Sequence, residues 1–586
     1  MRWTAALLAF VYAAVISAVA LGFALKGLGV SSAWVALALG LAAAGFTWRS
    51  TPAGDAAKLR FWDWVVLSIF ALASLRAFLW VIFVTGDDIR VLSPNNLGDM
   101  SLHLNFIRYF ASGIPFWPEN PILTGGPLTY PLGVDLFNSL LEICGLDTIR
   151  GLVWVGLIGA GLTGYCLWRW GGAFGVAAFL FTGGLAGFVM LRTWEVADFQ
   201  QDLTWKNLFL SMFVTQRGLL IALPAGLLVL HALRERWFRS GRQIIPLWLQ
   251  YGLYAAMPLF NVHAFLFLSL ILLAMFIAEK RTRRALFGFV LAAVIPATVG
   301  VFLVTGAFSA DSGAGWAPTW VWGEKKWGEL FAMWGVFGET VLPWLWNFGI
   351  AGPLIIALII VLFFKKDQEA RCFVWTSMLI FGLCCLFKFA PWAWDNMKLM
   401  MWCWLISAPY LWSCLIRRLA PAAQVVLCFA LFFSGAVSLV GGLDRRDGHT
   451  IASRTELAAW KHAMRGIPAE TRVACVPDFN HPVILLGRKV ACGYEGHLWS
   501  HGLNFREKLG LLKSSLDGRI AWQESASKLD VGWLALRTKD IPFAVAPGEA
   551  PSSPALGALY DLELLKRNPA SQSPQQLPRQ SVGLSW

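Results

Sequence analysis

About thirteen long apolar segments, separated by charged connections, dominate this chain of 586 residues. Hydrophobic residues make up 57% of the sequence and charged residues 14%, whereas about a quarter of the residues of a soluble domain are charged. A helix needs about 20 apolar residues to cross a bilayer core about 30 Å thick. We therefore expect a polytopic α-helical membrane protein. The predicted spans are 4–25, 32–48, 62–84, 148–168, 172–190, 217–233, 244–259, 261–279, 285–307, 347–364, 372–389, 398–415 and 421–442, of which 244–259 and 261–279 could form one broken hairpin.

The net charge of +13 comes largely from basic residues gathered in particular connections. Cytoplasmic loops of membrane proteins are enriched in Lys and Arg, so these connections and the N-terminus are predicted to be cytoplasmic. The loops 85–147, 191–216 and 308–346 and the C-terminal tail are then exported. Topology explains the charge, so we expect no nucleic-acid partner. We call the following groups the basic clusters: Arg49, Lys58 and Arg60; Arg234, Arg236, Arg239 and Arg242; Lys280, Arg281, Arg283 and Arg284; Lys365, Lys366 and Arg371; and Arg417 and Arg418.

The composition changes after Leu443, which ends the predicted transmembrane domain 1–443. Residues 444–568 are predicted to form a small exported α/β domain, because short β-rich runs alternate with helical stretches. Ser453 and Glu456 form a capping box for its first helix. Residues 569–586 are expected to be disordered. The β-rich runs are 472–476, 483–486, 490–493 and 533–537, and residues 504–515 are predicted to be helical.

Eight of the ten cysteines lie in or beside apolar segments without a metal-like spacing and are interpreted as small core residues. Cys475 and Cys492 lie in the exported tail, where a disulfide is chemically allowed. The sequence leaves their pairing open, because it does not supply the required geometry.

The exported loop 85–147 is polar and aromatic, unlike a linker. Asp99 and His103 are four residues apart, so a helix places them on one face, and the apolar Leu102, Phe106 and Phe110 could anchor that helix in the membrane interface. We expect an exposed loop helix that presents Asp99 for chemistry. Asp99 could equally be a helix N-terminal acid favoured by the macrodipole. The loop holds four further acids, Asp87, Asp88, Glu119 and Asp135, and Asp88 is the alternative catalytic acid.

A sequence pattern extends from Asp99 through His103 and Ile107-Arg108-Tyr109 to Gly113-Ile114-Pro115, and continues in Pro127-Leu128-Thr129-Tyr130-Pro131. It resembles the first large exported loop of the GT-C superfamily, polytopic glycosyltransferases that use polyprenyl-phosphate sugars. This superfamily includes the protein mannosyltransferases and the catalytic subunit of oligosaccharyltransferase. The resemblance implies a GT-C-like fold and a catalytic Asp99, with His103 beside it and Tyr130 as a substrate contact. Met100 stands where the family often has Glu, so a need for a divalent cation such as Mg²⁺ or Mn²⁺ stays open.

Three cations at exported helix ends would suit a lipid-phosphate donor: Arg217, Lys206 and Lys388. Arg217 could hold a phosphate through bidentate hydrogen bonds, and charges away from the cytoplasmic ends of spans are functional candidates. Snorkelling to lipid headgroups is the alternative for Arg217 and Lys388. Trp394 and Asp395, next to Lys398, are further candidate substrate contacts.

The tail holds a polar, aromatic and glycine-rich stretch at 493–502, preceded by Arg488. His497 and His501 could be metal ligands by their spacing, but no third ligand completes a zinc site. We expect Arg488, His497 and His501 to contact the acceptor or donor, or to pack against the membrane domain. His263 is either a hydrogen-bonded helix histidine or a residue that faces the cavity.

Seven tryptophans gather in the loop 308–346 and its end: Trp316, Trp320, Trp322, Trp327, Trp334, Trp344 and Trp346. They could pack on lipid headgroups as an interfacial belt does, or stack against sugar rings or a polyprenyl chain.

The sequence contains no P-loop, Rossmann or zinc-protease motif, and an exported active site cannot reach cytosolic nucleotide sugars. We therefore expect an inverting, integral-membrane glycosyltransferase, in a bacterial inner membrane. It would transfer a sugar from a polyprenyl phosphate to a glycan, lipid or protein acceptor on the exported face. Two alternatives stay open. A secondary transporter or lipid flippase would carry ionisable residues in mid-helix on several spans, and a non-catalytic assembly factor would give Asp99 no special role.

Overall fold

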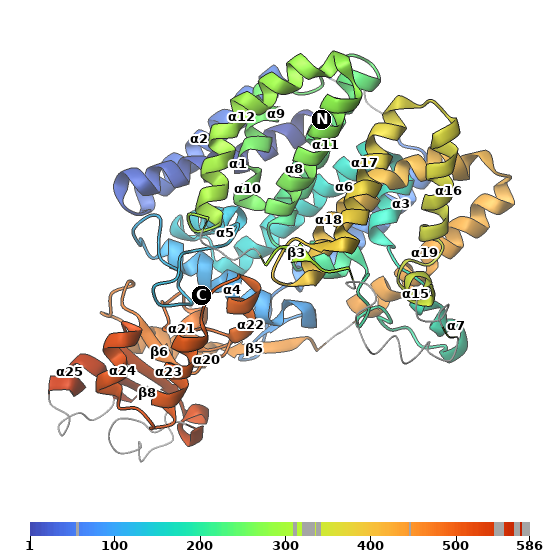
Figure 1. Ribbon diagram of the computed structural model, residues 1–586. Helices are drawn as coiled ribbons and strands as arrows, with labels where there is room; N and C mark the ends of the chain where they lie inside the picture. Colours follow the sequence, from blue (N-terminus) through green and yellow to red (C-terminus); the bar gives the residue numbers. More distant parts are fainter. Residues whose placement is uncertain are drawn as a thin grey trace.

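The computed structural model describes residues 1–53, 58–308, 313–318, 335, 341–444, 447–543, 556–567 and 575–576. Helices dominate it, and the C-terminal region forms a smaller body beside the helical part (Figure 1). Within these residues, eight helices are long and apolar enough to cross a membrane. They are α1 (Arg2–Leu25), α2 (Val30–Ser50), α3 (Phe61–Leu79), α6 (Thr148–Leu180), α12 (Arg283–Val304), α17 (Gln368–Leu386), α18 (Met397–Tyr410) with the turns around it, and α19 (Pro421–Leu443).

The expected thirteen spans are not confirmed, because several apolar segments are short, bent or joined. Segments 148–168 and 172–190 share one element, α6, which bends at Gly172 with a φ of 62° and ends at Leu180. Segments 244–259 and 261–279 form three helices, α9 (Leu247–Ala255), α10 (Met257–Phe260) and α11 (Val262–Ala278). Segment 217–233 forms α8 (Leu219–Phe238), and segment 347–364 forms α15 (Leu342–Phe348) and α16 (Ala351–Phe364), a pair bent by 92° that would be a ninth span.

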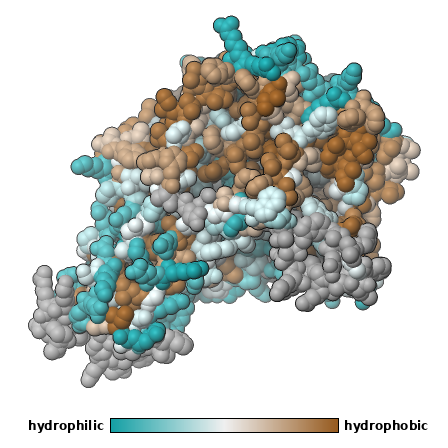
Figure 2. Space-filling model, in the orientation of Figure 1, coloured by the Kyte–Doolittle hydropathy of each residue, from teal (hydrophilic) through white to brown (hydrophobic). Residues whose placement is uncertain are grey.

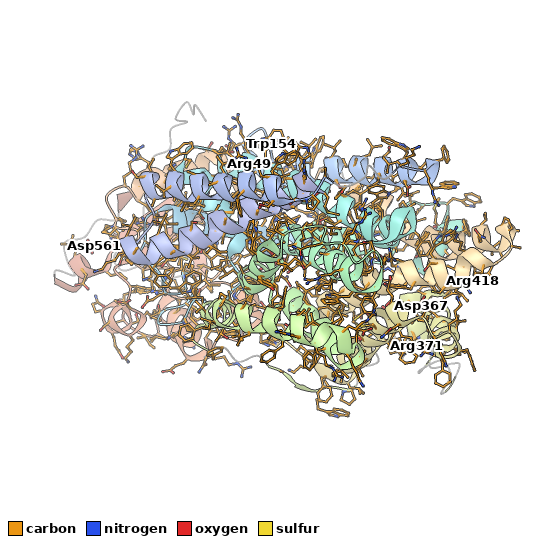
Figure 3. The ribbon with its side chains drawn as sticks, turned by 90° about the horizontal axis from the view of Figure 1, so that it is seen from above. Arg49, Trp154, Asp367, Arg371, Arg418 and Asp561 are labelled. Carbon is orange, nitrogen blue, oxygen red and sulfur yellow. The ribbon has the colours of Figure 1, made fainter. Side chains whose placement is uncertain are left out.

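Hydrogen bonds and ion pairs join the connections that carry the basic clusters at one end of the helical part. Arg2 Nε donates to Thr51 O at 2.8 Å. Arg239 Nη2 lies 2.8 Å from Glu369 Oε1, and Gln368 Nε2 donates to Glu279 Oε2 at 2.6 Å. Seen from above, Arg371 and Arg418 lie on one side of the helical part, and Asp561 of the C-terminal region lies at the opposite edge (Figure 3).

Hydrophobic side chains cover the flank of the helical part below this basic end (Figure 2). Helix α8 runs toward the basic end and finishes there. Its 20 residues correspond to a length of about 30 Å, which is the thickness of a bilayer core. Helices α12 and α18 join the same two ends. The helical part therefore has a basic end and, one bilayer thickness away, an opposite end where the loop 85–147 lies.

The loop 85–147 folds against the C-terminal region. Strands β1 (Phe83–Thr85) and β2 (Asp88–Val91) form an antiparallel pair, and β5 (His449–Ser453) of the C-terminal region adds to β2 as the third strand. Helices α4 (Leu97–Ala111) and α5 (Gly133–Ile143) follow. The expected exposed helix is wrong, since Leu102, Phe106 and Phe110 are buried. Helix α5, the segment 116–130 and the C-terminal region surround α4 and take the place of the membrane interface.

Polar bonds fix the C-terminal region on α4. Asn105 Nδ2 donates to Ile484 O at 2.8 Å, and Arg108 Nη1 donates to Leu485 O at 2.6 Å. Gly487 has a φ of 73° and lies against the α4 backbone, so that a Cβ there would come within 2.5 Å of the Arg108 Cβ. This turn admits only glycine without displacing α4.

The C-terminal region combines a small sheet with short helices. Strands β6 (Val473–Cys475), β7 (Trp533–Arg537), β8 (Gly557–Asp561) and β9 (Gln575–Gln576) follow one another in the sheet, with β6 and β7 parallel. The helices are α20 (Arg454–Ala463), α21 (Pro482–Leu485), α22 (Glu495–Ser500), α23 (Arg506–Leu516), α24 (Trp522–Leu529) and α25 (Leu562–Arg567). The cap of α20 is confirmed, because Glu456 N donates to Ser453 Oγ at 3.1 Å.

One expectation for this region is wrong, and one question that the sequence left open is answered. The predicted strand 483–486 is helical, because Pro482 occupies the first turn of α21, a position that suits proline. Cys475 and Cys492 do not pair; both are free and buried, where they pack as small apolar residues. Most of the predicted disordered tail 569–586 lies outside the described residues, and Gln575 and Gln576 pair with β8.

We predict that Gly487→Ala loosens the C-terminal region from α4. The left-handed backbone and the contact with Arg108 together should cost about 2 kcal/mol or more. Gly510→Ala is the matched control, because Gly510 lies in α23 with open space around its Cα, and alanine there should stabilise the helix by about 0.5–1 kcal/mol. Thermal unfolding in detergent measures both, and an unchanged midpoint in Gly487→Ala would disprove the tight docking.

Candidate functional site

A cavity of about 600 Å³ lies at the end of the helical part opposite the basic clusters. Residues from the loop 85–147, the segment 201–218, the ends of α10 to α12, the segment 389–398 and the C-terminal helix α22 meet around it. Its polar and aromatic lining includes Asp99, Tyr130, Asp202, Lys206, Gln216, His263, Trp392, Trp394, Asp395, Lys398, His497 and His501. The lining thus contains seven of the twelve candidate site residues, drawn from regions as far apart in the sequence as Asp99 and His501.

Asp99 lies in the first turn of α4 and lines this cavity. Gln216 Nε2 donates to Asp99 Oδ2 over a long 3.4 Å. Burial raises the pKa of the Asp99 carboxyl above its usual value, and the nearby His103 and Lys398 only partly oppose this shift. A carboxylate in such a setting is a stronger base than an exposed aspartate.

His103 pairs with Asp135 of α5 behind Asp99. Its Nδ1 lies 2.9 Å from both carboxylate oxygens of Asp135, and both side chains are buried. The His103 ring also meets the edge of Tyr130, with ring centroids 5.9 Å apart. The Asp135 carboxylate therefore fixes the orientation of His103, which in turn supports Tyr130 in the cavity wall.

Arg217 is buried, with 1% of its surface exposed, so it does not snorkel to headgroups. Its Nη2 donates to Val214 O at 3.1 Å, while Nε and Nη1 have no hydrogen-bond partner in the described part of the chain. It is close enough to Asp135 and Asp99 to interact with their charges. Arg217 lies just behind the cavity-lining residues Gln216 and Gly218. Its Nε and Nη1 could donate hydrogen bonds to a ligand.

Two lysines line the cavity on its other side. Lys398 Nζ lies 3.1 Å from Asp395 Oδ1, and Lys206 Nζ lies 5.8 Å from the ring centre of Trp394. Trp394 is fixed in turn, because its Nε1 donates to Thr204 O at 3.1 Å. The cavity therefore offers ammonium groups beside an aromatic wall.

Helix α22 of the C-terminal region closes the cavity. A Cβ on Gly98 would lie 3.1 Å from His497 Nε2, so the glycine lets this histidine reach the start of α4. The ring of His501 lies 4.9 Å from that of Tyr130. Burial lowers the pKa of His497 to about 4 and that of His501 to about 3. Both rings are neutral at pH 7 and suit an uncharged ligand.

Five candidate site residues lie outside the cavity lining. His103 and Arg217 lie behind it, as described above, and the other three have partners elsewhere. Asp88 forms an ion pair with Arg90 at 2.6 Å and accepts from Thr450 Oγ1, so it ties β2 to β5. Lys388 belongs to the short strand β4 (Phe387–Lys388), which pairs with β3 (Gly315–Trp316). Arg488 Nη2 donates to Ile467 O at 2.6 Å inside the C-terminal region.

The tryptophan cluster is only partly described. Trp316 is exposed, and Trp344 stacks on Phe348 with ring centroids 5.4 Å apart. Neither lines the cavity. Trp320, Trp322, Trp327 and Trp334 lie outside the described residues.

Two of the residues that we did not assign to the site have a signal in the sequence. Asp135 is an acid set between Val134 and Leu136 in an apolar helix, a pattern that indicates a buried and paired charge. Trp392 repeats the aromatic character of Trp394 two residues earlier. Gln216 carried no signal of its own. Within the described ranges, no group of three or more His, Cys, Asp or Glu side chains is placed to hold a metal ion.

No family model matches the chain, and no curated protein matches it. Solved structures similar to it include the crystal structure of the Archaeoglobus fulgidus oligosaccharyltransferase in complex with Zn and sulfate. The identity is 12% and the TM-score 0.43, over 80% of this chain and 68% of that one. The apo form of the same enzyme has 11% identity and a TM-score of 0.38, over 81% of this chain and 69% of that one. Because both TM-scores are below 0.5, we base the function on the cavity residues.

Proposed function

We propose that this protein is an inverting membrane glycosyltransferase of the GT-C type. Its donor would be a sugar on a polyprenyl phosphate, and its acceptor a hydroxyl of a glycan, lipid or protein. The observation that carries the proposal is the cavity, which joins the half-buried acid Asp99, three nearby cations and an aromatic wall. Acid, cation and aromatic groups in one cavity suit a neutral sugar linked to an anionic leaving group.

Asp99 acts as the base in the proposed reaction. The acceptor hydroxyl oxygen attacks the anomeric carbon, the bond from that carbon to the phosphate oxygen breaks, and polyprenyl phosphate leaves. The hydroxyl proton goes to the Asp99 carboxylate. Attack from the face opposite the leaving group inverts the anomeric centre. His103 and Asp135 keep the wall beside Asp99 in place.

Cations stabilise the phosphate as it leaves. Arg217 has two nitrogens without hydrogen-bond partners in the described chain, and Lys206 lines the cavity. In place of Lys388, we assign the third position to Lys398, which lies in the lining four residues beyond Trp394. Trp392 and Trp394 would stack against the sugar ring, since aromatic faces pack on the apolar faces of sugars, and the neutral His497 and His501 would contact the acceptor.

The proposed orientation places the basic end in the cytoplasm and the cavity on the exported side. Positive-inside bias supports it, together with the contacts that bring the basic clusters to one end. A cavity on the exported side cannot meet cytosolic nucleotide sugars, so a lipid must deliver the activated sugar. The setting would be a multi-pass protein of a bacterial inner membrane. The gathering of charged side chains in one cavity at one end distinguishes this proposal from a secondary transporter or lipid flippase.

Asp99→Asn is expected to lower the rate of sugar transfer by about 10²–10⁴-fold, because the amide cannot accept the hydroxyl proton. Asp88→Asn is the matched control, because Asp88 lies outside the cavity. The measurement is single-turnover transfer from a labelled polyprenyl-phosphate sugar. Full activity in Asp99→Asn with loss of activity in Asp88→Asn would move the base to the other acid.

The midpoint of the acid limb of the pH–rate profile is expected at a pH above the ordinary aspartate pKa of about 3.9. Burial favours the neutral carboxyl of Asp99, so the carboxylate that serves as base is lost earlier as the pH falls. Rates at saturating donor across the acid range measure this limb. A limb that persists unchanged in the residual activity of Asp99→Asn would assign the titration to another group.

Arg217→Lys is expected to weaken donor binding by about tenfold or more, because lysine cannot form the bidentate pair with phosphate. Arg488→Lys is the control, since Arg488 donates to a backbone carbonyl outside the cavity. Binding of a non-transferable polyprenyl-phosphate sugar analogue is measured by calorimetry. Normal affinity in Arg217→Lys, Lys206→Ala and Lys398→Ala together would contradict a lipid-phosphate donor.

A further inference from the structure

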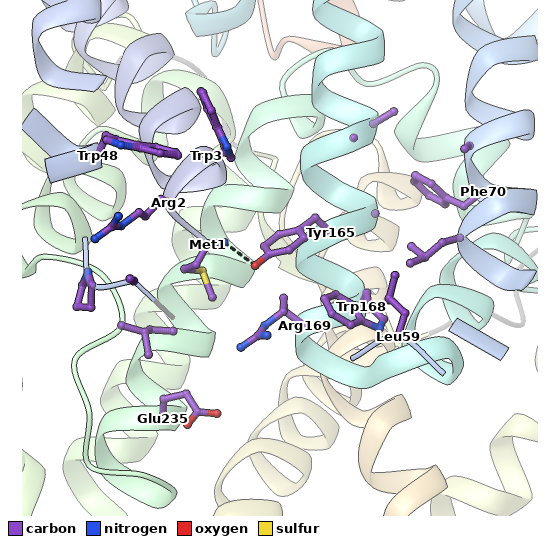
Figure 4. Close-up of a pocket in the computed structure, with 18 of the residues that line it drawn as sticks. Met1, Arg2, Trp3, Trp48, Leu59, Phe70, Tyr165, Trp168, Arg169 and Glu235 are labelled. Atoms are coloured by element: carbon purple, nitrogen blue, oxygen red, sulfur yellow. Dashed lines mark hydrogen bonds between the residues drawn. The ribbon is translucent and has the colours of Figure 1, made fainter. Parts of the chain in front are cut away.

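A second and larger cavity lies at the basic end, with a volume of about 1500 Å³ (Figure 4). It is bounded by the start of α1, by Trp48, Pro52, Ala53 and Leu59, by helices α3 and α6, and by the segment 235–244. We call it the basic-end groove. It exceeds the roughly 300–1,000 Å³ of ordinary small-molecule sites and shares no residue with the cavity around Asp99.

One part of the groove is apolar and opens toward the lipid-facing surface. Leu67, Phe70 and Leu75 of α3 face Leu157 and Ala160 of α6 across it. Leu75 is 45% exposed. On α6, a Cβ added to the lining residue Gly161 would meet no atom within 4 Å, so this glycine leaves the space between the helices open. A slot of this shape and polarity suits an acyl chain.

The other part carries a net positive charge. Arg2, Arg169 and Arg242 line it, and Glu235 is the single acid among the lining residues that the structure describes. The Glu235 carboxylate is already engaged, because Ser240 Oγ donates to it at 3.0 Å and Arg239 Nη1 lies 3.8 Å away. Within the described residues, Glu235 therefore forms no ion pair with Arg2, Arg169 or Arg242.

Two lining groups have unused hydrogen-bonding capacity. In the part of the chain that the structure describes, Arg169 forms no ion pair, and its Nε is buried without a partner. Ser74 Oγ is likewise buried without a partner, on a side chain whose residue is 4% exposed. A buried donor left unsatisfied destabilises the protein, and a bound phosphate would accept a hydrogen bond from Arg169 Nε.

Tryptophans mark the level of the membrane surface in the groove. Trp3 and Trp48 lie with ring centroids 4.2 Å apart beside Arg2, and Trp168 lies next to Arg169 (Figure 4). Tryptophan is enriched where headgroups meet acyl chains. The positive part of the groove therefore lies at headgroup depth and the apolar part at acyl-chain depth.

We propose that the basic-end groove binds one anionic phospholipid from the leaflet at the basic end. Its phosphate contacts Arg169 and Arg2, and an acyl chain lies between α3 and α6 beside Gly161. This site is separate from the proposed glycosyl transfer, and its ligand is a structural or regulatory lipid of the surrounding membrane.

The test uses the full-length protein, delipidated in a neutral detergent, with bound lipid measured by native mass spectrometry. Three probes are titrated: phosphatidylglycerol, phosphatidylcholine with the same acyl chains, and inorganic phosphate. Arg169→Gln should lower phosphatidylglycerol affinity by about tenfold or more. Its control is Arg150→Gln, at the exposed start of the same helix. Gly161→Leu should block the acyl-chain slot, and Gly45→Leu is its control, since space around Gly45 is also open.

The site is supported when Arg169→Gln and Gly161→Leu both lose phosphatidylglycerol binding and both control variants keep it. Equal affinity for phosphatidylcholine would overturn it in favour of unspecific acyl-chain packing. Competition by inorganic phosphate at the same concentration would overturn it in favour of a free-anion site. Unchanged phosphatidylglycerol binding in both groove variants also overturns it, and none of these outcomes depends on whether the protein transfers sugars.

Discussion

The contacts between α4 and the backbone of residues 484–487 fix the C-terminal region relative to the membrane helices, and the cavity depends on that placement. Asn105 and Ile484 are 379 residues apart in the chain and are joined by a buried bond. Arg108 adds a second bond to Leu485 O. In a water-free contact each such bond is costly to break, because it leaves a buried polar group unsatisfied. With α4 fixed in this way, Asp99 in its first turn has one position relative to both the membrane helices and α22.

Charges in the cavity divide into those that are satisfied and those that are not. His103 with Asp135, and Lys398 with Asp395, form close pairs, and paired charges can be buried at an acceptable free-energy cost. Arg217 keeps two nitrogens without partners in the chain as described, and Asp99 has only one long bond. The paired groups shape the cavity walls, while Arg217 and Asp99 could form further hydrogen bonds with a ligand.

Sequence reasoning singled out Asp99 and several residues that line the same cavity, because these depend on local patterns. The helical spacing of Asp99 and His103, the cap at Ser453 and the strand 533–537 are all found in the structure. The sequence cannot choose between Lys388 and Lys398, because both flank the same turn and only tertiary packing decides which side chain lines the cavity. The expected number of spans is not confirmed, because hydropathy does not detect a bend such as that at Gly172. Helix α4 was expected at a membrane surface because the sequence pattern of an apolar helix face is the same whether lipid or protein covers that face.

The closeness of Gly98 to His497 has a consequence for how the protein is made. The acid enters the structure early in synthesis, whereas the wall that faces it follows some 400 residues later, since translation proceeds from the N-terminus. Until α22 has been synthesised and has folded against the start of α4, the cavity has an open side and Asp99 stays in contact with water. A partly inserted chain therefore lacks the desolvation that raises the pKa of this carboxyl. The completed fold, rather than any single residue, sets the proton affinity of Asp99.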